Sequence, residues 1–153
     1  LDSMGIYHSN LKIDSYIFKY NFDYNCINNP TKYNNYLLLK NFDNCVIIKD
    51  YNKNYRKKIN DAYPQYIAPE KLSIKSTKLK GIYYKTADIY SIGAIVYSIL
   101  FKKLPECNPV NLFGNNNDII ISDECKDFLS KLLEKDYTLR INVDDALTHK
   151  WIN

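Results

Sequence analysis

The longest run of apolar positions lies between Ile89 and Phe101, where hydrophobic side chains fall on every face of a helix. Such a helix is enclosed by protein, because a surface helix keeps one polar face. Thr86 is placed to cap the first turn, and Asp88 stands where the helix dipole favours a carboxylate. Two serines and a glycine interrupt the run before it reaches the roughly 20 residues that a bilayer requires. The pattern predicts a central core helix within 85–101 and no membrane span.

Other segments show weaker but readable patterns. After Ser122, apolar residues recur at i, i+3, i+4, i+7 and i+8 spacing, which predicts an amphipathic helix with one packed face. These residues are Cys125, Phe128, Leu129, Leu132 and Leu133. Asn142 is placed to cap a short helix over 143–148, and the β-rich run 45–49 predicts a strand. These patterns therefore predict three helices and one short strand.

Composition narrows the function classes. The chain has 153 residues, 46% of them hydrophobic, which predicts one globular domain. Only two of its 21 basic residues are arginine, so we expect no nucleic-acid partner despite a net charge of +4. Its four cysteines form no C-x-x-C pair and its two histidines are far apart, which argues against zinc and for an intracellular, cytoplasmic protein. Leu1 is not an initiator residue, so we expect a piece of a longer protein.

Several short motifs occur in a fixed order. Residues 5–12 read Gly-Ile-Tyr-His-Ser-Asn-Leu-Lys, residues 68–70 Ala-Pro-Glu, residues 88–93 Asp-Ile-Tyr-Ser-Ile-Gly, and residues 149–152 His-Lys-Trp-Ile. These resemble the catalytic loop, the end of the activation segment, the F helix and the closing motif of protein kinases. Residues 5–152 thus resemble the C-terminal lobe of a Ser/Thr kinase of the calcium/calmodulin-dependent or calcium-dependent type. The resemblance implies a mainly α fold with a small β-hairpin near residues 16 to 49, and we expect the N-terminal lobe to be absent from these residues.

The catalytic-loop motif departs from the family at two positions. Asn10 stands where the resemblance implies the catalytic Asp, and Ser9 stands where it implies an Arg. An amide has no useful basicity, so Asn10 cannot take the proton of a substrate hydroxyl. Lys12 keeps the position of the catalytic-loop Lys, and the resemblance gives His8 a structural role. The loop therefore looks like that of a degenerate, pseudokinase-like domain.

For metal binding, the resemblance leaves one clear position and one open choice. Asp50 follows the strand predicted over 45–49, where the family has the magnesium-binding Asp of Asp-Phe-Gly. The second metal ligand aligns with Ser15 if the sequence is followed without a gap, or with Asn35 if an insertion comes first. The Asn/Tyr-rich stretch 19–34 looks like a low-complexity loop insertion, and a hairpin tip tolerates one better than a catalytic loop. That argument favours Ser15.

Three further residues have architectural roles implied by the resemblance. Glu70 of the Ala-Pro-Glu motif is expected to pair with Arg140, which lies far along the chain, and Asp88 is expected to hold the backbone of the catalytic loop. Between Tyr51 and Ile67, the segment matching the activation loop contains neither Ser nor Thr. A regulatory phosphate on this segment is therefore not expected. The short connection 104–121 leaves little room for the family's docking helix.

These observations leave more than one function open. The leading interpretation is a pseudokinase-type binding or allosteric scaffold module whose protein partner the sequence does not identify. The second is part of a Ser/Thr kinase that binds ATP and magnesium and transfers phosphate when an N-terminal lobe is present. The third is a decayed fragment without function. No glycine-rich loop and no strand Lys for ATP phosphates occur within these residues.

Overall fold

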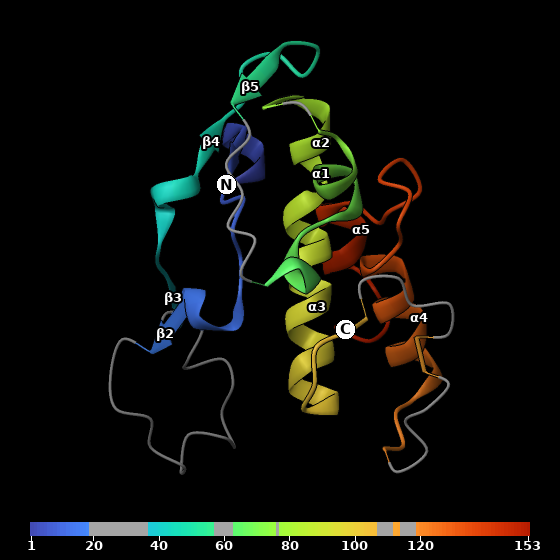
Figure 1. The fold of residues 1–153 in the computed structure, drawn as a ribbon. Helices are drawn as coiled ribbons and strands as arrows, with labels where there is room; N and C mark the ends of the chain where they lie inside the picture. The colour runs from blue at the N-terminus through green and yellow to red at the C-terminus, as the bar shows by residue number, and fades with distance from the viewer. Residues whose placement is uncertain (19–36, 57–62, 76, 107–111, 114–118) are drawn as a thin grey trace.

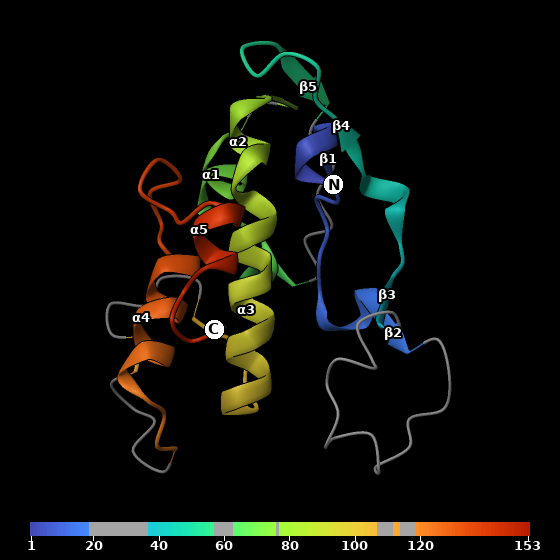
Figure 2. The same ribbon diagram turned by 180° about the vertical axis from the view of Figure 1, so that it is seen from behind.

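One long helix, α3 (Ala87–Phe101), runs through the middle of the computed structural model. Figures 1 and 2 show the labelled β-strands and the N-terminus on one side of α3, and the helices α4 (Asp123–Leu132) and α5 (Val143–Leu147) on the other. The structure describes residues 1–18, 37–56, 63–75, 77–106, 112–113 and 119–153. The remaining helices are α1 (Pro69–Ser73), α2 (Ile82–Lys85), α4 (Asp123–Leu132) and α5 (Val143–Leu147).

The strands are short and pair two by two. They are β1 (Ile6–Tyr7), β2 (Tyr16–Phe18), β3 (Leu37–Leu39), β4 (Val46–Ile47), β5 (Asn54–Arg56) and β6 (Lys78–Lys80). β1 pairs with β4, β2 with β3, and β5 with β6, each antiparallel. Single turns of 3-10 helix lie at Asp2–Met4, Ile13–Ser15, Phe42–Asn44 and Pro64–Tyr66.

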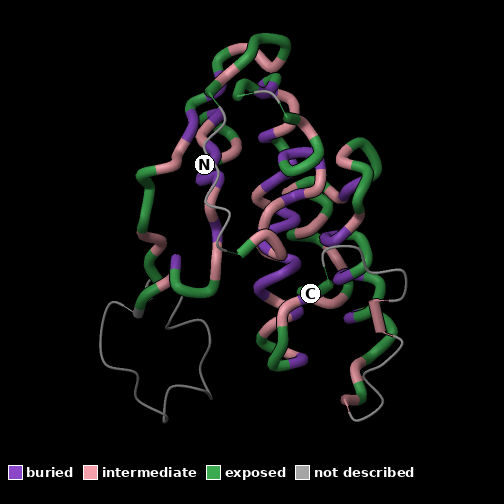
Figure 3. Tube along the Cα trace, in the orientation of Figure 1, coloured by how far each residue is buried: buried purple, intermediate pink, exposed green. Residues whose placement is uncertain are grey.

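Burial of α3 confirms the core helix predicted from its apolar run. Its buried residues lie on several faces, and Figure 3 shows buried positions along most of its length. These are Ala87, Ile89, Tyr90, Ser91, Gly93, Ala94, Ile95, Tyr97 and Phe101. Within the described parts of the chain, no helix is long and apolar enough to cross a bilayer.

The predicted cap at Thr86 is wrong. Thr86 does occupy the N-cap position of α3, but its hydroxyl donates to the carbonyl of Tyr137 at 3.3 Å and caps no helix N–H. A capping residue usually has extended backbone, which lets its side chain reach back to the first turn. α2 ends only one residue before Thr86, whose φ of −116° and ψ of 0° are not extended. The junction between α2 and α3 therefore turns the hydroxyl elsewhere.

The helix that follows Ser122 is confirmed in its start and in its buried face. The Ser122 hydroxyl accepts from the N–H of Cys125 at 3.2 Å, and the predicted apolar positions of α4 and its C-cap are all buried. α4 lies very close to α3, because a Cβ added at Gly93 would come within 2.8 Å of the Leu132 Cβ. Asn142 caps α5 through the N–H of Asp145 at 2.9 Å, as predicted.

The β structure agrees only in part with the predictions. A hairpin does form, with Tyr16 opposite Leu39 and Phe18 opposite Leu37. The run 45–49 yields only the two-residue strand β4, and the β5–β6 ribbon was not predicted. The predicted insertion 19–34 lies outside the described residues. Most of the connection 104–121 does too, and its described residues form no helix.

Candidate functional site

One carboxylate in the first turn of α3 fixes the loop that follows β1. Asp88 Oδ2 accepts from the N–H of His8 at 2.6 Å, and Asp88 Oδ1 accepts from the N–H of Ser9 at 2.8 Å. Burial raises the pKa of Asp88, while the Lys71 ammonium and the two backbone N–H groups act in the opposite direction. The loop backbone is thus anchored to the core helix at two successive residues.

The His8 ring lies inside the fold. The residue is 1% exposed, its ring packs 5.1 Å from that of Phe42, and its Nε2 lies 2.8 Å from the carbonyl oxygen of Lys40. Because a carbonyl only accepts, Nε2 carries the proton. Nδ1 is buried and has no hydrogen-bond partner among the described residues. The ring ties the loop to the segment after β3 and reaches no solvent.

Asn10, Lys12 and Ser15 lie together in the same loop. The Ser15 hydroxyl accepts from the N–H of Lys12 at 3.1 Å and donates to the carbonyl of Asn10 at 3.4 Å. The Lys12 ammonium lies 5.7 Å from the centroid of the Tyr63 ring, which belongs to the segment preceding α1. Ser15 is completely buried, whereas Asn10 is partly exposed. Asn10, where the resemblance implies a general base, is therefore accessible but carries an amide.

Asp50 lies in the turn after β4, and both oxygen atoms of its carboxylate face other groups of the turn. One carboxylate oxygen accepts from the N–H of Asn52 at 3.0 Å, and the other lies 3.7 Å from the Lys53 ammonium. Magnesium needs several oxygen ligands in octahedral geometry. The buried Ser15 hydroxyl already donates and accepts, and the described residues contain no cluster of acidic, His or Cys side chains. Asn35, the alternative ligand, lies outside the described residues.

Tyrosine hydroxyls fix the segment around Asp50. The Tyr55 hydroxyl accepts from the N–H groups of Lys49 and Asp50, both at 3.0 Å. The Tyr51 hydroxyl lies 2.9 Å from that of Tyr7. Burial raises the pKa of Tyr7, as does its hydrogen bond to a carboxylate. The sequence did not reveal these contacts, because tyrosine is so frequent in this chain that none of its positions stands out.

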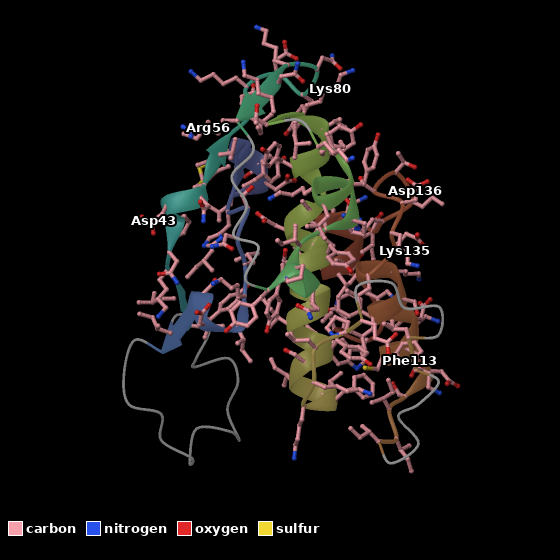
Figure 4. All side chains as sticks on the ribbon, in the orientation of Figure 1. Asp43, Arg56, Lys80, Phe113, Lys135 and Asp136 are labelled. Carbon is pink, nitrogen blue, oxygen red and sulfur yellow. The ribbon has the colours of Figure 1, made fainter. Side chains whose placement is uncertain are left out.

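The segment that follows Asp50 also pairs with the chain that leads into α2, through the β5–β6 ribbon. Beyond the strand pairing, Gly81 donates its N–H to the carbonyl of Lys53 at 2.8 Å, and Ile82 donates to that of Tyr51 at 3.0 Å. Figure 4 shows Arg56 and Lys80 at this end of the molecule. The chain from Asp50 to Arg56 is therefore bound along its backbone to the residues that lead into α2.

Glu70 and Arg140 form a bidentate ion pair inside the fold. Arg140 Nη1 donates to Glu70 Oε1 at 2.8 Å, and Arg140 Nη2 donates to Glu70 Oε2 at 2.9 Å. The arginine side chain is 0% exposed and that of Glu70 is 6% exposed. Arg140 also donates to the carbonyls of Glu134 at 2.7 Å and Thr86 at 3.0 Å. The pair thus connects α1 with the turn after α4, where Figure 4 labels Lys135 and Asp136.

Lys71 is a buried residue of this site that sequence reasoning missed. Its ammonium donates to the carbonyl and to the hydroxyl of Ser9, both at 3.0 Å. No sequence signal pointed to it, because a lysine in a short helix is usually solvated. α1 therefore presents two adjacent buried charges, one to the C-terminal part of the chain and one to the loop of residues 8–15.

A model of the protein kinase domain family matches residues 1–152, so the chain belongs to this family. It is 29% identical over 119 residues to myosin light chain kinase 2, skeletal/cardiac muscle, of Mus musculus, which covers 70% of this chain and 18% of the relative. It is 34% identical over 120 residues to calcium-dependent protein kinase 4 of Plasmodium falciparum (isolate 3D7), which covers 67% of this chain and 20% of the relative. The expected kinship with kinases of the calcium-dependent type is confirmed.

Solved structures support the same fold. The crystal structure of the Rad53 kinase domain and SCD2 matches with a TM-score of 0.65 and 24% sequence identity. The match covers 99% of this chain and 49% of that one. A second structure of the same protein, in complex with AMPPNP, matches equally well, with a TM-score of 0.65. The chain thus spans about half of these kinase structures and about a fifth of the curated relatives.

Proposed function

We propose that residues 1–153 form the C-terminal lobe of a protein kinase domain that serves as a binding or allosteric scaffold module. The observation that carries this proposal is the contrast within the loop of residues 8–15. Its backbone is anchored by Asp88 to the core helix, whereas the side chain at the general-base position, Asn10, is an amide. The scaffold for catalysis is folded, but the group that would accept the proton is absent from it.

The surroundings of Asp50 and the segment that follows it support the same proposal. The described residues supply one carboxylate here, already engaged by Asn52 and Lys53, and contain no group of three or more acidic, His or Cys side chains that could hold a metal ion. The segment 51–67 has no Ser or Thr to phosphorylate, so it offers no site for the usual switch in this position. A folded lobe can bind partners without these groups, whereas phosphoryl transfer requires them, so the properties of this lobe favour a binding function.

The alternative is a working Ser/Thr kinase completed by an N-terminal lobe. It is favoured by the survival of Asp50 and of Lys12 in the catalytic loop, and by the kinases among the relatives. In that case ATP and magnesium are the expected cofactors, with Asp50 and either Ser15 or Asn35 as ligands. We further propose an intracellular setting and a protein partner, and we interpret residues 19–34 as a loop insertion in this single domain.

Phosphate transfer by wild-type chain and by the Asn10→Asp variant tests the proposal. Both are incubated with radiolabelled ATP, magnesium and a generic protein substrate, alone and joined to the native N-terminal lobe where one exists. We expect no transfer by wild type in either form. General-base catalysis raises a rate only by a factor of about 10²–10⁴. We therefore also expect no phosphate transfer by the Asn10→Asp variant alone. Kinases typically turn over at about 1 per second or faster. A rate of this size for the wild-type chain with its lobe attached would establish the alternative.

A further inference from the structure

Lys71 is a charged side chain inside the fold for which the proposed function gives no role. It is 3% exposed and lies in α1, directly after Glu70. Its ammonium contacts two oxygen atoms of Ser9 at 3.0 Å and lies 5.3 Å from the centroid of the buried Tyr84 ring. Lysine is almost never fully buried unless its charge is paired, because desolvation of an isolated charge is costly. The oxygen atoms and the aromatic face form a site that accepts a cation.

Ser9, the partner of Lys71, is held at each of its polar groups. Its N–H donates to Asp88 Oδ1 at 2.8 Å, while its carbonyl and its hydroxyl both accept from Lys71. Its φ is +70°, in the left-handed region that residues with a Cβ atom seldom adopt. Such a conformation persists only where surrounding contacts over-determine it. A carboxylate and an ammonium, which come from two different helices, here supply those contacts.

The conformation of Ser9 decides where the next residue lies. Asn10 follows directly, so a change of φ at Ser9 would swing the backbone that carries the Asn10 side chain. The carbonyl of Asn10 also accepts from the buried Ser15 hydroxyl, which fixes the loop on its other side. The left-handed turn is therefore the point at which the position of residue 10 is set.

We propose that Lys71 is a positioning residue which, together with Asp88, clamps Ser9 in its left-handed turn and so fixes residue 10 without any phosphorylated side chain. We call Ser9, Lys71 and Asp88 the Ser9 clamp. Its ammonium group is part of α1 itself and is not added by a modification, in keeping with a segment 51–67 that lacks Ser and Thr. The clamp acts on the chain's own backbone, so it holds whether or not the module binds a partner or transfers phosphate.

Native-state hydrogen exchange in the 153-residue chain tests the clamp. Lys71→Met keeps the length of the side chain and removes its charge, and Lys75→Met on the exposed Lys75 is the matched control. In Lys71→Met we expect the amides of His8 and Ser9 to exchange at least about tenfold faster relative to that of Leu129 in α4, the effect of losing one charge-assisted hydrogen bond. The control is expected to leave this ratio unchanged. An equal rise at all three amides would overturn the proposal.

A second substitution separates clamping from general stabilisation. Glycine adopts a positive φ at no steric cost, so adding Ser9→Gly to Lys71→Met is expected to restore slow exchange at the His8 amide. Adding Ser9→Ala instead is expected not to restore it, because alanine keeps the Cβ atom. Equal behaviour of the two double variants would overturn the proposal. If Lys71→Met does not fold, the single variants decide, with faster exchange expected for Ser9→Ala than for Ser9→Gly and the reverse order refuting the clamp.

Discussion

Replacing Arg140 by alanine is expected to be among the most destabilising changes in this chain. The guanidinium and the Glu70 carboxylate are almost completely enclosed, and they share two hydrogen bonds of 2.8 and 2.9 Å. Removing one member of a buried ion pair costs about 3–5 kcal/mol, because the other charge is left desolvated and unpaired. Water cannot easily reach the carboxylate to replace the lost partner.

The structure also orders the two single substitutions. Arg140→Ala removes the ion pair and also the donors to the carbonyls of Glu134 and Thr86. We therefore expect it to lower the free energy of unfolding by about 5 kcal/mol, the upper end of the range for a broken buried pair. Glu70→Ala leaves the arginine in contact with those carbonyls and with the Tyr90 ring, 5.1 Å from Cζ. We therefore expect Glu70→Ala to lower the free energy of unfolding by about 3 kcal/mol, the lower end of that range.

Denaturant melts of Arg140→Ala, Glu70→Ala and the double variant measure these losses. The double variant should lose less than the sum by about 0.5–3 kcal/mol, because the second substitution removes the charge that the first left unpaired. The exposed pair of Lys126 and Asp123 is the matched control, and Lys126→Ala should cost less than about 1 kcal/mol. Strictly additive losses at Glu70 and Arg140, or losses no larger than the control, would refute this reasoning.

Three further expectations follow from other parts of the molecule. If the chain bound ATP with a Kd of about 1 μM, about 100 μM ATP with magnesium would raise its free energy of unfolding by about 2.7 kcal/mol. We expect thermal melts to show no such saturable increase in Tm. Gly93→Ala should lower the Tm, because the new methyl group meets Leu132 at 2.8 Å and overpacking costs about 1–3 kcal/mol, more than the gain in helix propensity. Hydrogen bonds from Lys131 and His149 lower the pKa of Asp127, so this carboxylate stabilises the fold above the ordinary Asp pKa of about 4 and the contribution is lost as the pH falls further. Asp127→Asn should therefore flatten the acid side of the stability profile, and an unchanged slope below about pH 4 would contradict this.

The sequence predicted the elements whose signal is local. α3 and α4 were readable from the spacing of their apolar residues, and the caps at Ser122 and Asn142 from single polar residues before a helix. The cap at Thr86 failed because α2 ends one residue earlier and sets its backbone. The β5–β6 ribbon escaped prediction because its strands have three residues each, too few for a periodic pattern.

The residues of the candidate site likewise fall into those that the sequence identified and one, Lys71, that it did not. Asn10, Lys12 and Asp50 were identified because they lie in contiguous motifs, and the pair of Glu70 with Arg140 because two motifs implied one contact. Lys71 carries no such signal. Its burial depends on a partner 62 positions away and on the ring of Tyr84, and only the folded chain brings these groups together. Its type alone suggested a solvated surface residue.

The β5–β6 ladder and the Ser9 clamp both join the chain up to Arg56 to the chain after Pro69. Hydrogen bonds from Gly81, Ile82 and Tyr84 reach back to residues 51–56, and those from Lys71 reach Ser9. All of these hydrogen bonds join residues that lie outside 57–68. Two fragments separated there, one with β1–β5 and one with α1–α5, carry complementary halves of the same interface. They are expected to reassemble when mixed, and failure to do so would show that the fold requires covalent continuity at this place.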